Sequence, residues 1–227
     1  MKNYIVFDLE WNQSANGKER SVPHFPFEII EIGAVKLNEN FQMTGEFHRL
    51  VRPQVYTQMH HAISEVTHMN MKELRSSGEL FPDAAAEFLA WCGGDAVFCT
   101  WGNMDLLELQ RNMDYYHMEN PFPKPLLYYD VQKLYGLFCR ENARISLDSA
   151  VEEQNLMEDR PFHRALDDAY YTGKLLTMLG KTPGPDAILP FKSVDYYRLP
   201  SDKKEEIRMT FPGYSKYVSR VFDSKED

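Results

Sequence analysis

The chain has 227 residues, of which 43% are hydrophobic and 26% charged, enough for one globular domain with a sizeable apolar core. Its formal net charge of −9 argues against a protein that grips long duplexes, because that binding mode neutralises many phosphates with a basic face. A site that engages only the last few nucleotides of a strand is not excluded, since bound metal ions can supply its positive charge.

Neither the beginning of the chain nor its cysteines indicate an exported protein. The segment MKNYIVFDLEWN lacks the apolar core and the cleavage site of a signal peptide, and no apolar stretch is long enough to span a membrane. Cys92, Cys99 and Cys139 form no C-x-x-C pair, so neither a disulfide framework nor a thiolate zinc site is predicted. We therefore expect a cytoplasmic protein without a membrane partner.

The first fifty residues have the pattern of a strand meander. Residues 3–9 form a continuous β-prone run, which indicates a central strand buried on both faces. Residues 12–26 are polar and proline-containing, and predict a loop longer than a simple hairpin needs. Segments 28–37 and 43–53 flank a turn-like Asn-Glu-Asn and predict two further strands, paired antiparallel.

Beyond residue 80 the pattern changes to alternating helices and strands. Strands are predicted at 95–101 and 126–130, and helices at 81–94, from Asn103 to about His117, after Asp130, after Ser146 and at 163–179. Three antiparallel strands followed by parallel βα units predict an α/β fold of the ribonuclease H type, a mixed sheet flanked by helices.

The main domain is expected to close at Gly180, because a helix-ending glycine is followed there by prolines. We therefore divide the chain into a domain of residues 1–180 and a C-terminal extension, 181–227. A possible capping box, Asp202 and Glu205, would open a brief helix in this extension, whose role the sequence does not indicate.

Asp8 and Glu10 lie two residues apart at the end of an otherwise apolar strand. The period of two in a strand points both carboxylates to the same face. Like charges side by side repel, and a hard cation such as Mg²⁺ or Mn²⁺, which takes oxygen ligands, removes that repulsion. For this pair alone, a strand that merely emerges into solvent is an equally good interpretation.

Asp105 falls in the first turn of the helix that follows the strand 95–101. Strand-to-helix junctions at one edge of an open α/β sheet are where sites assemble. Taken alone, however, a first-turn aspartate is better explained by its favourable interaction with the helix dipole.

The segment HRALDDA (163–169) supplies a histidine and a further carboxylate. His163 precedes Asp168 by five positions, so the two share a face only if His163 lies at or before the helix start. A histidine there is a reasonable general base for water, although a lone histidine is more often a surface or capping residue. Asp168 is favoured over Asp167 because alanines at 165 and 169 indicate a close-packed inner face beside it.

Together, FDLE, EIIEIGAVKL, WGNMD and HRALDDA resemble, in order and spacing, the motifs of the DEDDh exonucleases. That family includes the proofreading subunit of bacterial replicative DNA polymerase, RNase T and oligoribonuclease. The resemblance covers roughly residues 3–180. It is strongest to the branch of histone-mRNA 3′-exonucleases and RNAi enhancers, which includes bacterial sporulation inhibitors of the KapD type.

The resemblance implies a two-metal 3′-to-5′ exonuclease that hydrolyses single-stranded nucleic acid, RNA rather than DNA, and releases nucleoside 5′-monophosphates. Four acids would hold two divalent cations, Mg²⁺ or Mn²⁺, and take part in catalysis: Asp8, Glu10, Asp105 and Asp168. His163 would be the base. Leu9, Trp11 and Ile63 are expected to bind substrate by apolar packing against the terminal base.

Two alternatives stay open on the sequence alone. One is a catalytically weak, nucleic-acid-binding regulatory module with the same fold, although all five expected positions carry the required residue types. The other is a structural interaction domain whose acids only decorate the ends of strands and helices, and that alternative predicts no thermal shift with Mn²⁺.

Overall fold

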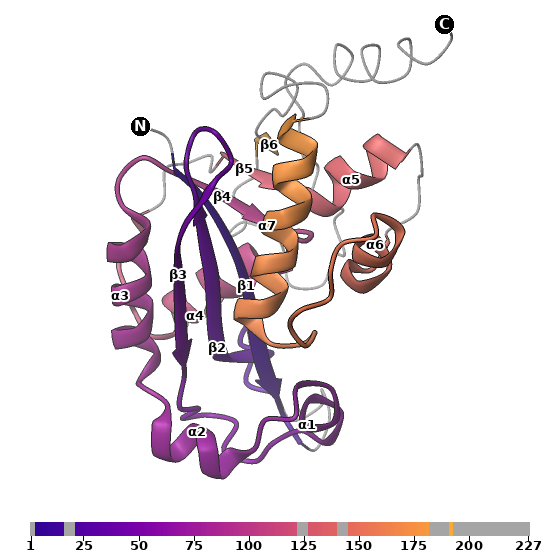
Figure 1. The fold of residues 1–227 in the computed structure, drawn as a ribbon. Coiled ribbons are helices and arrows are strands. Elements are labelled where there is room, and N and C mark those ends of the chain that lie inside the picture. Colours follow the sequence, from indigo (N-terminus) through magenta and orange to yellow (C-terminus); the bar gives the residue numbers. More distant parts are fainter. Residues whose placement is uncertain (1–2, 16–20, 122–126, 140–144, 182–190, 193–227) are drawn as a thin grey trace, which may run out of the picture.

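The computed structural model of the chain describes residues 3–15, 21–121, 127–139, 145–181 and 191–192 (Figure 1). Within these residues, the centre is a six-stranded sheet in the order β3-β2-β1-β4-β5-β6. The strands are β1 Asn3–Gln13, β2 Phe27–Leu37, β3 Met43–Leu50, β4 Ala96–Thr100, β5 Leu127–Asp130 and β6 Phe191–Lys192.

The directions of the strands confirm the predicted mixed sheet. β1, β2 and β3 pair antiparallel, whereas β4 runs parallel to β1 and β5 runs parallel to β4. β6, which the sequence did not predict, pairs antiparallel with β5. β4 pairs only with residues 3–6 of β1, so the rest of β1 continues past the end of β4 with β2 on one side.

The described residues form seven helices. They are α1 His61–Thr67, α2 Met71–Ser77, α3 Phe81–Cys92, α4 Met104–Tyr115, α5 Val131–Cys139, α6 Leu147–Glu153 and α7 Ala165–Lys181. α7 crosses one face, where Gly173 lies against Val35 and Val6 (Figure 1). In the described part of the chain, none of the helices has the length and apolar composition that crossing a membrane requires.

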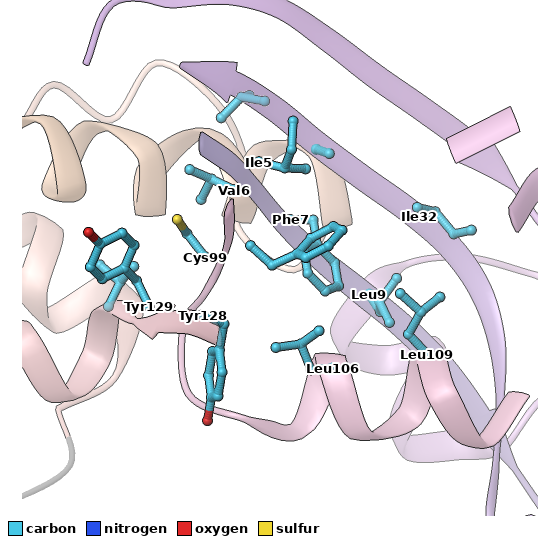
Figure 2. Packing of buried hydrophobic residues seen from close by; sticks show 14 of the residues in the cluster. Ile5, Val6, Phe7, Leu9, Ile32, Cys99, Leu106, Leu109, Tyr128 and Tyr129 are labelled. Atoms are coloured by element: carbon cyan, nitrogen blue, oxygen red, sulfur yellow. The ribbon is translucent and has the colours of Figure 1, made fainter. Parts of the chain in front are cut away.

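The apolar core continues on the opposite face of the sheet. Ile5, Phe7 and Leu9 alternate along β1 and enter the cluster that α3 and α4 cover (Figure 2). The ring of Phe7 lies 5.5 Å from that of Phe88 of α3. Because full burial of such side chains stabilises by about 1.5–3 kcal/mol each, this cluster fixes how β1 sits in the sheet.

Several details differ from the predicted elements. α1 and α2 were not predicted; each has only seven residues, and α2 depends on a local cap in which the Asn70 side chain accepts the backbone N–H of Glu73. Asn103 and Ser146 occupy N-cap positions, but neither side chain caps its helix by a hydrogen bond. α7 begins at Ala165 and continues through Gly180, whose missing side chain leaves room for Phe41.

The division of the chain at residue 180 and the possible helix of the C-terminal extension both stay predictions. The possible helix at Asp202 lies outside the described residues, and so does most of the extension beyond residue 181. The predicted loop 12–26 is described only in part: its first two residues belong to β1, and Val22 and Phe25 form an isolated bridge.

Candidate active site

Three of the four predicted acids meet where β1 runs past β4. Asp8 and Glu10 point to the face of β1 on which α7 packs, and Asp168 reaches them from the first turn of α7. One carboxylate oxygen from each of the three residues lies within 4.8 Å of the other two. All three side chains are only half-buried, so a cation and water can reach them.

Asp105, the fourth predicted acid, lies beside this group and binds the backbone of β1. It is 4% exposed, and its Oδ1 accepts the backbone N–H of Leu9 at 3.1 Å, between Asp8 and Glu10. Among the described residues, Asp105 is not part of the group whose oxygens lie within 4.8 Å of one another. Asp105 therefore links the first turn of α4 to β1, beyond the residues of β1 that pair with β4.

The acids raise one another's pKa. Burial, followed by the neighbouring carboxylates, raises the pKa of Glu10 to about 9 and that of Asp8 well above its usual value. Burial is also the first cause that raises the pKa of Asp168 and Asp105 to about 7 each. Arg164 opposes the shift at Glu10. Carboxylate oxygens that repel one another in this way are the donor set that hard divalent cations bind.

These raised pKa values predict how the stability of the metal-free protein depends on pH. A carboxyl group whose pKa is higher in the folded than in the unfolded protein contributes stability below its unfolded pKa, about 4, and that contribution is lost as the pH rises through its folded pKa. Because the folded pKa values reach about 9 at Glu10, the melting temperature in EDTA should fall between about pH 4 and pH 9.

Thermal melts over this pH range test the prediction. Glu10→Gln should flatten the fall, and so should Mg²⁺, because each removes the charge repulsion at the cluster. An unchanged pH dependence in Glu10→Gln would contradict the assignment of the instability to these acids.

His163 lies two residues before the start of α7, as its proposed role requires. Its backbone is left-handed, with a φ of 65°, and its N–H donates to both Asp168 oxygens at 3.2 and 3.3 Å. Its side chain is exposed. The helix predicted from residue 163 begins at Ala165, so His163 meets the condition that it lie at or before the helix start. Asp167 turns away from the cluster toward Arg160, at 3.6 Å, which agrees with the choice of Asp168.

The expectation for Leu9 does not fit the structure. Leu9 is 3% exposed and lies in the core beside Ile32 and Leu109 (Figure 2), because the alternation that places Asp8 and Glu10 on one face places Leu9 on the other. Its side chain cannot pack against a nucleotide there. Trp11 is half-buried, with its ring 5.7 Å from that of Phe27, and Ile63 is half-buried on α1. A contact between a base and these two side chains stays a prediction.

Two residues that support the site were not predicted from the sequence. Glu31 is fully buried in β2 and binds Arg164 and the start of α7. Asn12 is also fully buried, and its side chain binds the backbone at Tyr56, Gln58 and His60. For Glu31 the signal was its position, a polar side chain inside the long apolar run of β2, whereas Asn12 falls in the predicted loop 12–26 and gave no such signal.

The model of an exonuclease family, of the RNase T type, matches residues 5–176. The chain belongs to this exonuclease family. It is similar to the probable 3′-5′ exonuclease KapD of Bacillus subtilis (strain 168), with 28% identity over 185 residues that cover 77% of this chain and 83% of that protein.

Solved structures show the same fold. The nuclease domain of 3′hExo, a DEDDh family member bound to rAMP, has a TM-score of 0.67 and 21% identity, covering 80% of this chain and 92% of that one. A 3′-exonuclease solved in 3′-end-specific recognition of a histone mRNA stem-loop has a TM-score of 0.72 and 19% identity, covering 93% and 74%. These likenesses confirm the predicted ribonuclease H-like architecture.

Proposed function

We propose that this exonuclease-family member is a metal-dependent 3′-to-5′ exonuclease that acts on single-stranded nucleic acid. The observation that carries the proposal is the convergence of Asp8, Glu10 and Asp168, from two distant parts of the chain, within 4.8 Å. The similarity to a protein named a probable 3′-5′ exonuclease supports the direction of digestion.

The donor set fits divalent cations of the Mg²⁺ or Mn²⁺ class. Asp8, Glu10 and Asp168 offer oxygen atoms only, at distances from one another that a shared cation can span. Asp105 would complete a second cation site, directly or through water. When bound, two such cations activate the attacking water and stabilise the departing 3′ oxygen.

The chain's own residues would then position water and move its proton. His163 is exposed and sits on a backbone that Asp168 holds, and its imidazole would take the proton from the attacking water. The oxygen of that water forms a bond to phosphorus, and the bond between phosphorus and the 3′ oxygen breaks. The products are a nucleoside 5′-monophosphate and a strand shortened by one residue with a new 3′-hydroxyl.

We further propose that RNA is preferred over DNA. The likeness to a nuclease domain bound to rAMP and to an enzyme that recognises histone mRNA supports this preference. The half-buried side chains of Trp11 and Ile63 are the candidates for packing on the terminal base.

A competition assay tests the substrate and the products together. RNA and DNA of one sequence, carrying different 5′ labels, are digested in one tube with Mn²⁺, and the released nucleotides are separated by chromatography. We expect faster loss of RNA and release of nucleoside 5′-monophosphates. Faster loss of DNA would contradict the preference, and nucleoside 3′-monophosphates would contradict the proposed chemistry.

A further inference from the structure

Glu31, in the middle of β2, is a buried carboxylate surrounded by donors. Its side chain is 1% exposed. It accepts hydrogen bonds from Nε of Arg164 at 3.1 and 3.2 Å, from Nη2 of Arg164 at 2.7 Å and from the backbone N–H of Ala165 at 3.0 Å. Nε2 of His48, on β3, lies 2.6 Å from its Oε1. A strand residue thus binds the first residue of α7 and the residue before it.

The pairing of β1 with β2 places this contact directly opposite the acids. Glu31 is the partner of Glu10 across the two strands, and Gly33 is the partner of Asp8. A side chain at Gly33 would place its Cβ 2.0 Å from the backbone nitrogen of Leu166, so β2 and the start of α7 touch backbone to backbone. The position of α7 on β2 therefore sets where Asp168 lies relative to Asp8 and Glu10.

Arg164 connects this contact to both functional residues of the α7 entrance. It lies between left-handed His163 and Ala165, and its backbone oxygen accepts the N–H groups of Asp167 and Asp168 at 2.9 Å each. The backbone N–H of His163 binds the Asp168 carboxylate in turn. A shift of Arg164 would therefore move His163 and Asp168 together.

We propose, on the basis of the proposed function, that Glu31 and Arg164 are positioning residues of the hydrolytic site. The pair fixes the position of the His163 turn and of the first turn of α7 relative to Asp8 and Glu10. Neither residue needs to touch the substrate, and neither is one of the four predicted metal ligands. A planar guanidinium that donates through two nitrogens fixes direction as well as distance, which a lysine cannot reproduce.

Arg164→Met tests the pair, with Arg49→Met as the matched control. Arg49 also joins the sheet to acidic side chains, at 2.7 Å from Glu87 and 3.3 Å from Glu79, and has a similar exposure, 38% against 32% for Arg164. Mutation of a residue that orients a metal ligand typically lowers activity about 10- to 100-fold. We expect that loss in kcat for Arg164→Met, with KM within about twofold, partial recovery in Arg164→Lys, and no change in Arg49→Met.

Mn²⁺ binding, measured by calorimetry, gives a readout that does not depend on activity. Removing the positive charge of Arg164 next to the acids would, by Coulomb attraction alone, tighten the binding of a cation. Misplacement of Asp168 predicts the opposite, a dissociation constant raised about tenfold. Binding in Arg164→Met that is as tight as or tighter than in the wild type would overturn the proposal.

A second variant tests the proposal in case Arg164→Met does not fold. Glu31→Gln/Arg164→Met removes both charges of the ion pair. Because no buried carboxylate is then left without a guanidinium beside it, the double variant should fold even if the single variant does not. It should show the same reduced kcat and weakened Mn²⁺ binding, and wild-type values of both would also overturn the proposal. If the wild type itself hydrolyses no nucleic acid, the proposed function fails, while the Mn²⁺ comparison still decides the role of the pair.

Discussion

Replacing Asp8 with asparagine is expected to abolish metal-dependent hydrolysis, with kcat reduced by at least about 10³-fold. A bound cation stabilises developing charge by several kcal/mol, and each 1.4 kcal/mol corresponds to about tenfold in rate. The other three predicted acids, Asp105, Glu10 and Asp168, each raise the pKa of Asp8. The variant keeps the size of the side chain and removes its charge.

The same variant should make the metal-free protein more stable. Loss of one carboxylate relieves the repulsion in the cluster, so the melting temperature in EDTA should rise, while the increase that Mn²⁺ causes in the wild type should disappear. Asp167→Asn is the control for activity, since Asp167 faces Arg160, although its charge also raises the pKa of the neighbouring Asp168. Wild-type activity in Asp8→Asn, or an inactive protein with a lowered melting temperature, would contradict the assigned role.

Replacing His163 with asparagine should reduce kcat about 10²- to 10⁴-fold while Mn²⁺ binding stays within about threefold of the wild type. This difference follows from the geometry: the hydrogen bonds from His163 to Asp168 come from its backbone N–H, which asparagine retains. Asparagine also tolerates the left-handed conformation at this position, where φ is 65°.

His68→Asn provides a matched control for this variant. His68 is likewise exposed and left-handed, with a φ of 57°, but lies at the end of α1. Its kinetic constants should not change. Steady-state kinetics and calorimetry on both variants decide the matter: equal losses of kcat in the two, or a loss of Mn²⁺ binding in His163→Asn that accounts for its lost activity, would exclude His163 as the base.

Local sequence patterns predicted the parts of the fold that depend on them. The long apolar run of β2 and the helix signals around α3 and α7 are properties of consecutive residues, and the structure has these elements near the predicted positions. α1, α2 and β6 were missed because they are short, and the segment around α1 also relies on distant partners. The loop before α1, for example, is held by buried Glu28, which accepts the backbone N–H groups of Gln54, Val55 and Tyr56.

In the site, too, local sequence patterns predicted only what depends on neighbouring residues. That Asp8 and Glu10 share a face follows from strand geometry, and the same geometry, applied to Leu9, would have placed it in the core. The convergence of Asp168 with them depends on how α7 meets β2 at Gly33 and Glu31, and a contact between residues more than 130 positions apart leaves no local pattern. The placement of Asp105 outside the close group depends on long-range packing in the same way.

Digestion of 5′-labelled single-stranded RNA by the wild-type protein in Mg²⁺ or Mn²⁺ shows whether the protein is a metal-dependent 3′-to-5′ exonuclease. EDTA and Asp8→Asn serve as controls. We expect a ladder of products that shorten one nucleotide at a time from the 3′ end, formed only when metal and Asp8 are both present. An intact strand despite bound Mn²⁺, or a ladder that persists in Asp8→Asn, would contradict this function.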